Sequence, residues 1–174
     1  MHTSIHKAIN QQITAELSAS YTYLAMSAYC DRQNFRGAAR WLRIQSQEEY
    51  GHAMKLFDFV LARGGQIELG TLTQPETEYA SIAAVFETAQ AQEQEVGRQI
   101  DSLYELAFRE KAFAALVELQ WFLTEQVEEE RTARELVAKF QMVKDDPASL
   151  LELDRELGAR QSVEPPPAAP APSV

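Results

Sequence analysis

The sequence predicts an all-α protein: a four-helix bundle with one long crossover connection and a short fifth helix at its C-terminal end. Three observations lead to this. The chain is rich in Ala, Glu, Gln and Leu and has only seven glycines, a composition that favours helix. Apolar residues recur at three- and four-residue spacing through four long segments, as expected of amphipathic helices. The links between these segments are short, long and short in turn.

The four predicted helices share this spacing and run from about Ser4 to Asp31, Phe35 to Arg63, Ser81 to Arg109 and Ala112 to Met142. Gly64 and Gly65 end the second helix, as glycine commonly does at a helix C-terminus. Asp145, Asp146 and Pro147 indicate the cap and first turn of a fifth helix that extends to about Gly158.

The lengths of the connections predict the topology. About three residues join the first two helices and the last two, so each pair forms an antiparallel hairpin. The middle link of about 17 residues can span a helix of about 28 residues, which is roughly 42 Å long. A crossover from one end of the bundle to the other fits best. The alternative, two separate hairpins on a flexible linker, would leave each apolar stripe exposed.

Residues 1–160 are therefore expected to form one domain, and residues 161–174 a disordered Pro-rich tail. Five of the seven prolines lie between Ser162 and Val174, a composition that does not form a packed element.

The charge and composition of the chain argue against nucleic acid and membranes as partners. A net charge of −10 argues against nucleic acid, because phosphate binding needs a basic surface. No apolar run approaches the roughly 20 residues that cross a bilayer, and Met1 to Ile5 do not resemble the start of a signal peptide. The lone Cys30 cannot form an intrachain disulfide. These features favour a cytoplasmic protein without a membrane partner.

Each of the four apolar stripes carries a polar residue near its midpoint: Glu16, Glu49, Glu93 and Gln126. One such residue usually means a side chain that reaches water. Here, Glu16 and Glu49 are equidistant from the first turn, and Glu93 and Gln126 from the last turn. All four are therefore expected to meet in the middle of the bundle.

Several carboxylates in an apolar core must be protonated or neutralised, and the stripes offer no Lys or Arg nearby. A multivalent cation is the remaining candidate. Glu49 and His52 are spaced i, i+3, so both can reach one ion while Glu49 bridges to a second. One imidazole among oxygen ligands favours iron or manganese. Zinc can also bind such a set but does no redox chemistry there.

With these residues, the chain resembles a bacterial non-haem ferritin from Ile5 to about Leu157. The resemblance rests on Glu16 with Tyr23, the run Gln47 to His52, Glu93-Gln94, Gln120 to Phe122 and the run Thr124 to Glu130. It implies a ferroxidase centre in which Glu16, Glu49 and His52 hold one iron. Glu49, Glu93 and Glu129 would hold the second, with Gln126 lining the site.

The resemblance also suggests two additions to this centre. Tyr23 and Trp121 match aromatic positions beside it, and Tyr23 is a candidate hydrogen-bonding or electron-donating residue; both also fit as plain core aromatics. Glu48, Glu125 and Glu128, with Glu129 shared, match a third iron site that faces the shell interior. The run Glu128 to Glu130 is equally typical of a solvated helix face.

Related bundles differ from this chain in identifiable ways. Bacterioferritins and rubrerythrin-type proteins carry a Glu-x-x-His pair on both the second and fourth helices, whereas the fourth helix here has Gln126-x-x-Glu129. No haem is expected, because Tyr50 stands where a haem-binding methionine would follow the bridging Glu49.

The resemblance implies iron storage and detoxification by a ferroxidase. Fe(II) would bind as a pair, be oxidised by O2 or H2O2, and be stored as ferric mineral inside a homo-oligomeric shell of about 24 subunits. Two alternatives remain: a stand-alone di-iron enzyme, which would need a substrate pocket or an electron carrier, and a metal-free interaction bundle, which the core carboxylates disfavour.

Overall fold

The computed structural model describes residues 2–144 and 146–161. The helices are α1 (Thr3–Arg32), α2 (Arg36–Ala62), α3 (Ile82–Arg109), α4 (Phe113–Val143) and α5 (Pro147–Gly158). They confirm the predicted fold class, and the ends of the four long helices lie within one residue of the predicted ends. Asp145 and, apart from Gln161, the predicted Pro-rich tail lie outside the described residues. Within the described ranges, no helix is apolar over a length that could cross a membrane.

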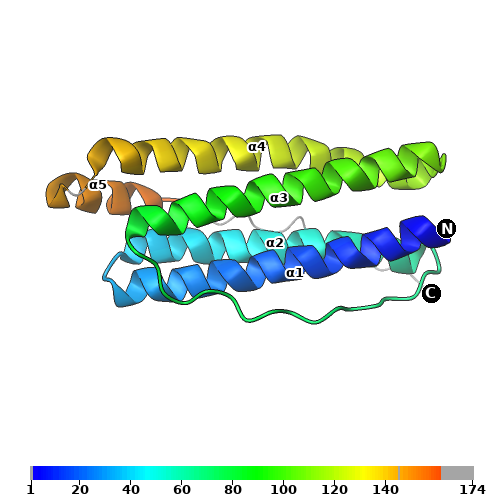
Figure 1. Cartoon of the computed structure of the whole chain (residues 1–174), viewed down its shortest axis with the longest axis horizontal. Coiled ribbons are helices and arrows are strands. Elements are labelled where there is room, and N and C mark those ends of the chain that lie inside the picture. Colours follow the sequence, from blue (N-terminus) through cyan, green and yellow to red (C-terminus); the bar gives the residue numbers. More distant parts are fainter. Residues whose placement is uncertain (1, 145, 162–174) are drawn as a thin grey trace, which may run out of the picture.

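The four long helices lie side by side, and α5 lies at one end of the bundle, next to the end of α4 (Figure 1). Local chemistry sets where the helices begin and end. Ser81 caps α3 by accepting a hydrogen bond from the amide of Ala84 at 3.1 Å. Asp146 caps α5 in the same way, and Pro147 occupies its first turn. Gly64 follows α2 with a φ of +66°, a conformation that glycine adopts without strain.

The connection from α2 to α3 runs along α1 for most of the length of the bundle (Figure 1). Side chains of α1 hold it in place. Asn10 Oδ1 accepts a hydrogen bond from the amide of Glu68 at 2.7 Å, and the Tyr29 hydroxyl donates to the carbonyl of Tyr79 at 2.8 Å. These contacts confirm the crossover topology and exclude two independent hairpins on a free linker.

The apolar core consists of two clusters, one toward each end of the bundle. The first contains the buried apolar residues of α1 and α2 between Tyr23 and Leu42, together with residues of the other helices such as Phe86, Phe140 and Leu157. The second contains apolar residues from the start of α1 and from the second half of α2. It also includes those on either side of the turn between α3 and α4, from Val96 to Phe122. Between the two clusters lies a layer of buried polar residues, to which every long helix contributes.

Candidate metal centre

The four polar residues predicted to meet do meet in this central layer. Glu16, Glu49, Glu93 and Gln126 are all buried, with exposed fractions of 1, 1, 2 and 7%. Each interrupts an apolar stripe at the same level. On α1, for example, Glu16 lies between Ile13 of one core cluster and Tyr23 of the other. Equal spacing from the two turns therefore brought residues from four helices to one height.

Three sets of three side chains could each hold a metal ion, and two of them share Glu49. The first is Glu16, Glu49 and His52, and the second is Glu49, Glu93 and Glu129; in each set the ligand atoms lie within 4.8 Å of one another. Glu49 belongs to both sets. His52 follows Glu49 by one helical turn, and its Nδ1 lies 3.3 Å from Glu49 Oε2. This geometry is the one that the i, i+3 spacing predicts.

Glutamine side chains orient three of the carboxylates. Gln12 Nε2 donates to Glu16 Oε1 at 2.9 Å. Gln45 Nε2 lies 3.2 Å from Glu49 Oε1 and 2.9 Å from Glu129 Oε1, and it donates to both. Each of these three glutamates thus has one oxygen that accepts a hydrogen bond. Its other oxygen, Oε2, is buried and has no hydrogen-bond partner in any of the three.

Unpartnered buried carboxylate oxygens are costly. Two metal ions, one in each of the sets described above, would satisfy all three oxygens. Oxygen ligands with one imidazole suit iron or manganese. The only cysteine, Cys30, is buried in the apolar cluster that contains Tyr23 and Leu42, so it adds no thiolate ligand to the centre.

Glu93 is held differently. The hydroxyl of Tyr23 donates a hydrogen bond to its Oε1. Gln126 Nε2 donates to Oε2 at 3.1 Å and also to the backbone carbonyl of Glu93 at 2.8 Å. Gln126 therefore fixes the Glu93 side chain by hydrogen bonds, and Tyr23 contacts the predicted second-iron ligand directly.

Burial controls the protonation of these groups. It raises the pKa of Glu49 well above the ordinary value, and the neighbouring charges of Glu93 and Glu16 raise it further. The pKa of Glu129 is raised well above the ordinary value by burial and by Glu49 and Glu93. Burial also raises the pKa values of Glu16 and Glu93, although hydrogen bonds from Gln12 and Tyr23 respectively act in the opposite direction. Without a metal ion, these carboxyls therefore keep their protons to higher pH than exposed glutamates do.

Tyr23 remains a neutral hydrogen-bond donor in this environment. Burial raises the pKa of its phenol well above the ordinary value, and the charge of Glu93 adds to that effect. On the other side of the centre, the edge of His52 packs against Trp121 with ring centroids 5.2 Å apart. Trp121 is itself 40% exposed, so it covers the histidine from the bundle surface.

The residues of the predicted third iron site line the outer mouth of the centre. A cavity of about 170 Å³ is lined by Glu48, Glu125, Glu128 and Glu129, among others, and by Tyr23 and Glu93 at its inner end. Glu125 also forms a three-ligand set with His52 and Glu129. Glu48 instead pairs with Arg160, at 2.5 Å, and Glu128 is exposed and lies 3.5 Å from Arg131.

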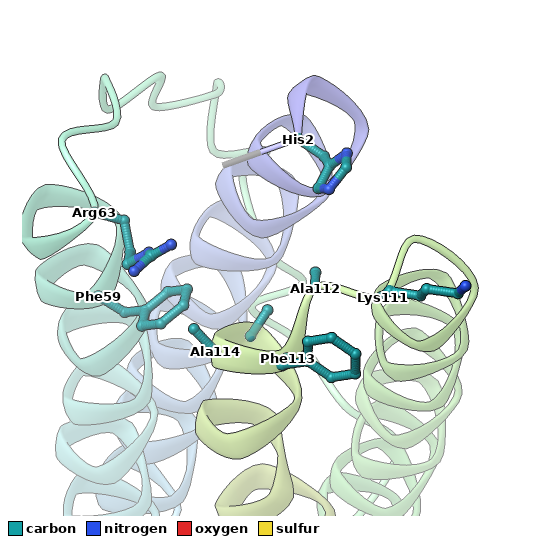
Figure 2. Close-up of a pocket in the computed structure, with 8 residues that line it drawn as sticks. His2, Phe59, Arg63, Lys111, Ala112, Phe113 and Ala114 are labelled. Atoms are coloured by element: carbon teal, nitrogen blue, oxygen red, sulfur yellow. The ribbon is translucent and has the colours of Figure 1, made fainter.

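A larger pocket, of about 510 Å³, lies elsewhere. Figure 2 shows it at one end of the bundle, between the start of α1, the end of α2 and the start of α4. His2, Arg63 and Lys111 line it together with aromatic and small side chains, and none of its lining residues is acidic. This pocket lacks the carboxylate ligands that an Fe(II) site needs.

Three residues at the centre escaped the sequence analysis: Gln12, Gln45 and Arg160. The first two carry a readable signal, because each glutamine precedes a predicted ligand by four residues, on the same helix face. Arg160 carries no such signal. It follows α5 in the chain, and only the packing of α5 against α2 brings it to the site.

Comparison with known proteins agrees with this geometry. A family model described as a ferritin-like domain matches residues 6–143. The chain is 36% identical over 154 residues to a "Bacterial non-heme ferritin" of Staphylococcus aureus strain USA300, and 38% identical over 154 residues to that of Staphylococcus haemolyticus. Each alignment covers 88% of this chain and 93% of the relative.

Solved structures lead to the same family. The chain is similar to an Archaeoglobus fulgidus ferritin engineered into a closed form, with a TM-score of 0.92, 42% identity, and coverage of 94% of this chain and 99% of that one. An open-pore ferritin from the same archaeon matches with a TM-score of 0.91 and 42% identity, over 92% and 99% of the two chains. The chain belongs to the ferritin family.

Proposed function

We propose that this iron-storage subunit oxidises Fe(II) at a buried di-iron ferroxidase centre. Glu16, Glu49 and His52 bind one Fe(II), and Glu49, Glu93 and Glu129 bind the other. Iron storage itself follows from membership of the ferritin family. The two overlapping ligand sets support the di-iron assignment.

One observation carries the proposal: Glu49, which both ligand sets share, has a buried Oε2 that forms no hydrogen bond and lies 3.3 Å from Nδ1 of His52, a ligand of the first set. A buried carboxylate with one oxygen that forms no hydrogen bond destabilises the folded protein unless a proton or a cation neutralises it. The unpartnered Oε2 atoms of Glu16 and Glu129 lie on either side, one in each set. The arrangement therefore suits two cations that share Glu49.

The proposed reaction balances without an organic cofactor or haem. Two Fe(II) ions give up one electron each and become Fe(III). The two electrons and two protons reduce O2 to H2O2, or H2O2 to two water molecules. The protons that the carboxylates release when iron binds are a local source for this step. The protein supplies ligand positions and compensates charge, and the iron performs the redox chemistry.

Tyr23 and Gln126 act on Glu93 in this proposal. Both donate hydrogen bonds to the Glu93 carboxylate, so they set its orientation toward the second iron position. Through its hydrogen bond to Glu93, Tyr23 is also a candidate electron donor during turnover. Gln126 lines the site beside Glu93.

Glu48, Glu125 and Glu128, with Glu129 shared, could form a third iron position in this proposal only in competition with the ion pair of Glu48. The acidic cavity at the mouth of the centre supports it. The ion pair between Glu48 and Arg160 opposes it, because a guanidinium and a divalent cation would compete for the same carboxylate.

We further propose that residues 1–160 form one ferritin-like unit and that about 24 copies assemble into a hollow cytoplasmic shell that holds ferric mineral. Several large apolar side chains are exposed in the single subunit, and they are suited to subunit contacts: Tyr21, Leu24, Leu72, Phe108, Phe113, Val117 and Val127. One bundle of this size cannot enclose a mineral by itself.

Aerobic iron loading tests this function. Fe(II) is added to the metal-free protein, the oxidation is followed in a stopped-flow spectrophotometer, and the particle mass is measured afterwards. We expect a fast phase of two Fe(II) per subunit, followed by growth of a large, iron-filled particle. Glu49→Ala should abolish the fast phase, and Glu105→Ala, an exposed change on α3, should retain it. A small particle with rapid oxidation would instead indicate a stand-alone di-iron enzyme.

A further inference from the structure

Helix α5 is fixed against α2 by contacts that leave little freedom. The carboxylate of Asp154 accepts hydrogen bonds from the amides of Gly37 and Ala38, at 3.1 and 2.8 Å. It thereby caps the N-terminus of α2, which has no cap from its own preceding residue. Leu153 and Leu157 of α5 are buried in the adjoining apolar cluster.

Close packing at Gly37 reinforces this docking. A Cβ atom on Gly37 would lie 1.7 Å from the carbonyl oxygen of Asp154, so only glycine permits the approach. Gly158, at the end of α5, lies against the same residue. Arg160, which follows α5, therefore lies beside α2, where its side chain reaches Gln45 and Glu48.

The docking of α5 places Arg160 beside Glu48 and Gln45 of α2. Its Nη2 lies 2.5 Å from Glu48 Oε2, and its Nη1 donates to Gln45 Oε1 at 2.9 Å. Its guanidinium carbon lies 4.5 Å from the centroid of the Trp41 ring, a cation–π contact. The side chains of Arg160 and Glu48 are only 24 and 19% exposed. Three partners thus hold the guanidinium in a largely enclosed place.

This place coincides with the third iron position proposed above. Arg160 lines the same cavity as Glu48, Glu125 and Glu128. The guanidinium of Arg160 is already paired with the Glu48 carboxylate, so a divalent cation cannot bind that carboxylate at the same time. Its positive charge also repels a divalent cation from the rest of the cavity.

Arg160 also influences the buried pair through Gln45. Because Gln45 Oε1 accepts from Arg160, its amide nitrogen must face the other way, toward Glu49 and Glu129. Rotation of this amide would place an oxygen against two carboxylate oxygens. Arg160 is therefore a positioning residue for two predicted iron ligands.

We propose that Arg160 is a built-in cation that occupies the third metal position of this subunit and fixes the orientation of Gln45. The centre consequently binds two metal ions while α5 is docked, and a third only when Arg160 is withdrawn or replaced. This inference rests on the proposed function of the buried pair.

Calorimetric titration of the assembled, metal-free protein with Co(II) tests it, because Co(II) prefers similar ligands and needs no oxidant. We expect two ions per subunit in the wild type and a third in Arg160→Gln, bound at least tenfold more tightly than any third ion in the wild type. Arg160→Lys, which keeps the positive charge, should restore a count of two. Arg155→Gln is the matched control, since Arg155 lies on α5 and, among the described residues, forms an ion pair with the exposed Glu152 alone.

Two further comparisons make the test decisive. Glu48→Gln combined with Arg160→Gln should return the count to two, because the third ion needs Glu48. A wild type that binds three ions with similar affinity overturns the inference without any variant, as do equal counts and affinities in wild type and Arg160→Gln. If the buried pair binds no ion in any variant, the proposed function fails instead.

Discussion

Replacing Glu49 by Gln should stabilise the metal-free protein and remove its response to metal. The amide keeps the size of the side chain and can still accept a hydrogen bond from Gln45 through its oxygen. Burial and the neighbouring carboxylates raise the pKa of Glu49 well above its usual value of 4.5. If the group stays protonated at pH 7, folding costs up to about 3 kcal/mol, at about 1.36 kcal/mol per pH unit. The glutamine avoids this cost.

That free energy corresponds to a rise in Tm of up to about 10 °C, at about 2–4 °C per kcal/mol for a chain of this length. Scanning calorimetry of metal-free protein at pH 7 measures it, and the difference should shrink near pH 4.5, where unfolded glutamate also becomes protonated. Co(II) at about 100 times its Kd should stabilise the wild type by about 2.7 kcal/mol and the variant much less. Glu105→Gln, an exposed change, should behave as the wild type.

The opposite result would refute this reasoning. If Glu49→Gln melted at or below the wild-type temperature at pH 7, and Co(II) raised its Tm as much as that of the wild type, Glu49 would be neither strained by burial nor a shared ligand.

Three other predictions follow from the same contacts. Tyr23→Phe removes the hydroxyl that donates to Glu93, so it should slow the fast oxidation phase and cost about 1 kcal/mol in the free energy of unfolding; an unchanged rate would leave Tyr23 a core aromatic only. Gly37→Ala forces α5 from α2 and should lower that free energy by about 2–4 kcal/mol through the lost cap and leucine burial, whereas Gly51→Ala, with open space around it, should not destabilise the protein in the same thermal melt. Metal-free protein should lose stability as pH rises from about 4.5, because the raised pKa values of Glu49 and Glu129 make the folded state bind more protons than the unfolded state; melts of Co(II)-loaded protein should show a weaker slope.

The fold was predictable because its signals are periodic and local. Spacing of apolar residues located four helices, and the lengths of three links dictated the crossover. The core of the site followed from the same geometry, since Glu16 and Glu49 are equidistant from one turn and Glu93 and Gln126 from the other. A constant rise per residue lets spacing along a long helix predict the height at which a side chain lies.

The supporting residues were harder to predict for a physical reason. Gln45 reaches Glu129 across the bundle, a contact that depends on how two hairpins dock and not on spacing within one helix. The position of Arg160 depends further on the docking of α5. That docking rests on the contact between Asp154 and Gly37, which are 117 residues apart in the sequence. Tertiary contacts of this kind leave no periodic pattern.

The central claim is that four helices place two iron ions in the buried carboxylate layer. Crystals of the metal-free protein, soaked with Fe(II) in the absence of oxygen, test it most directly through anomalous difference maps at the iron edge. The account predicts two peaks per subunit, one among Glu16, Glu49 and His52 and one among Glu49, Glu93 and Glu129. Iron peaks confined to surface carboxylates, with none in the buried layer, would contradict it.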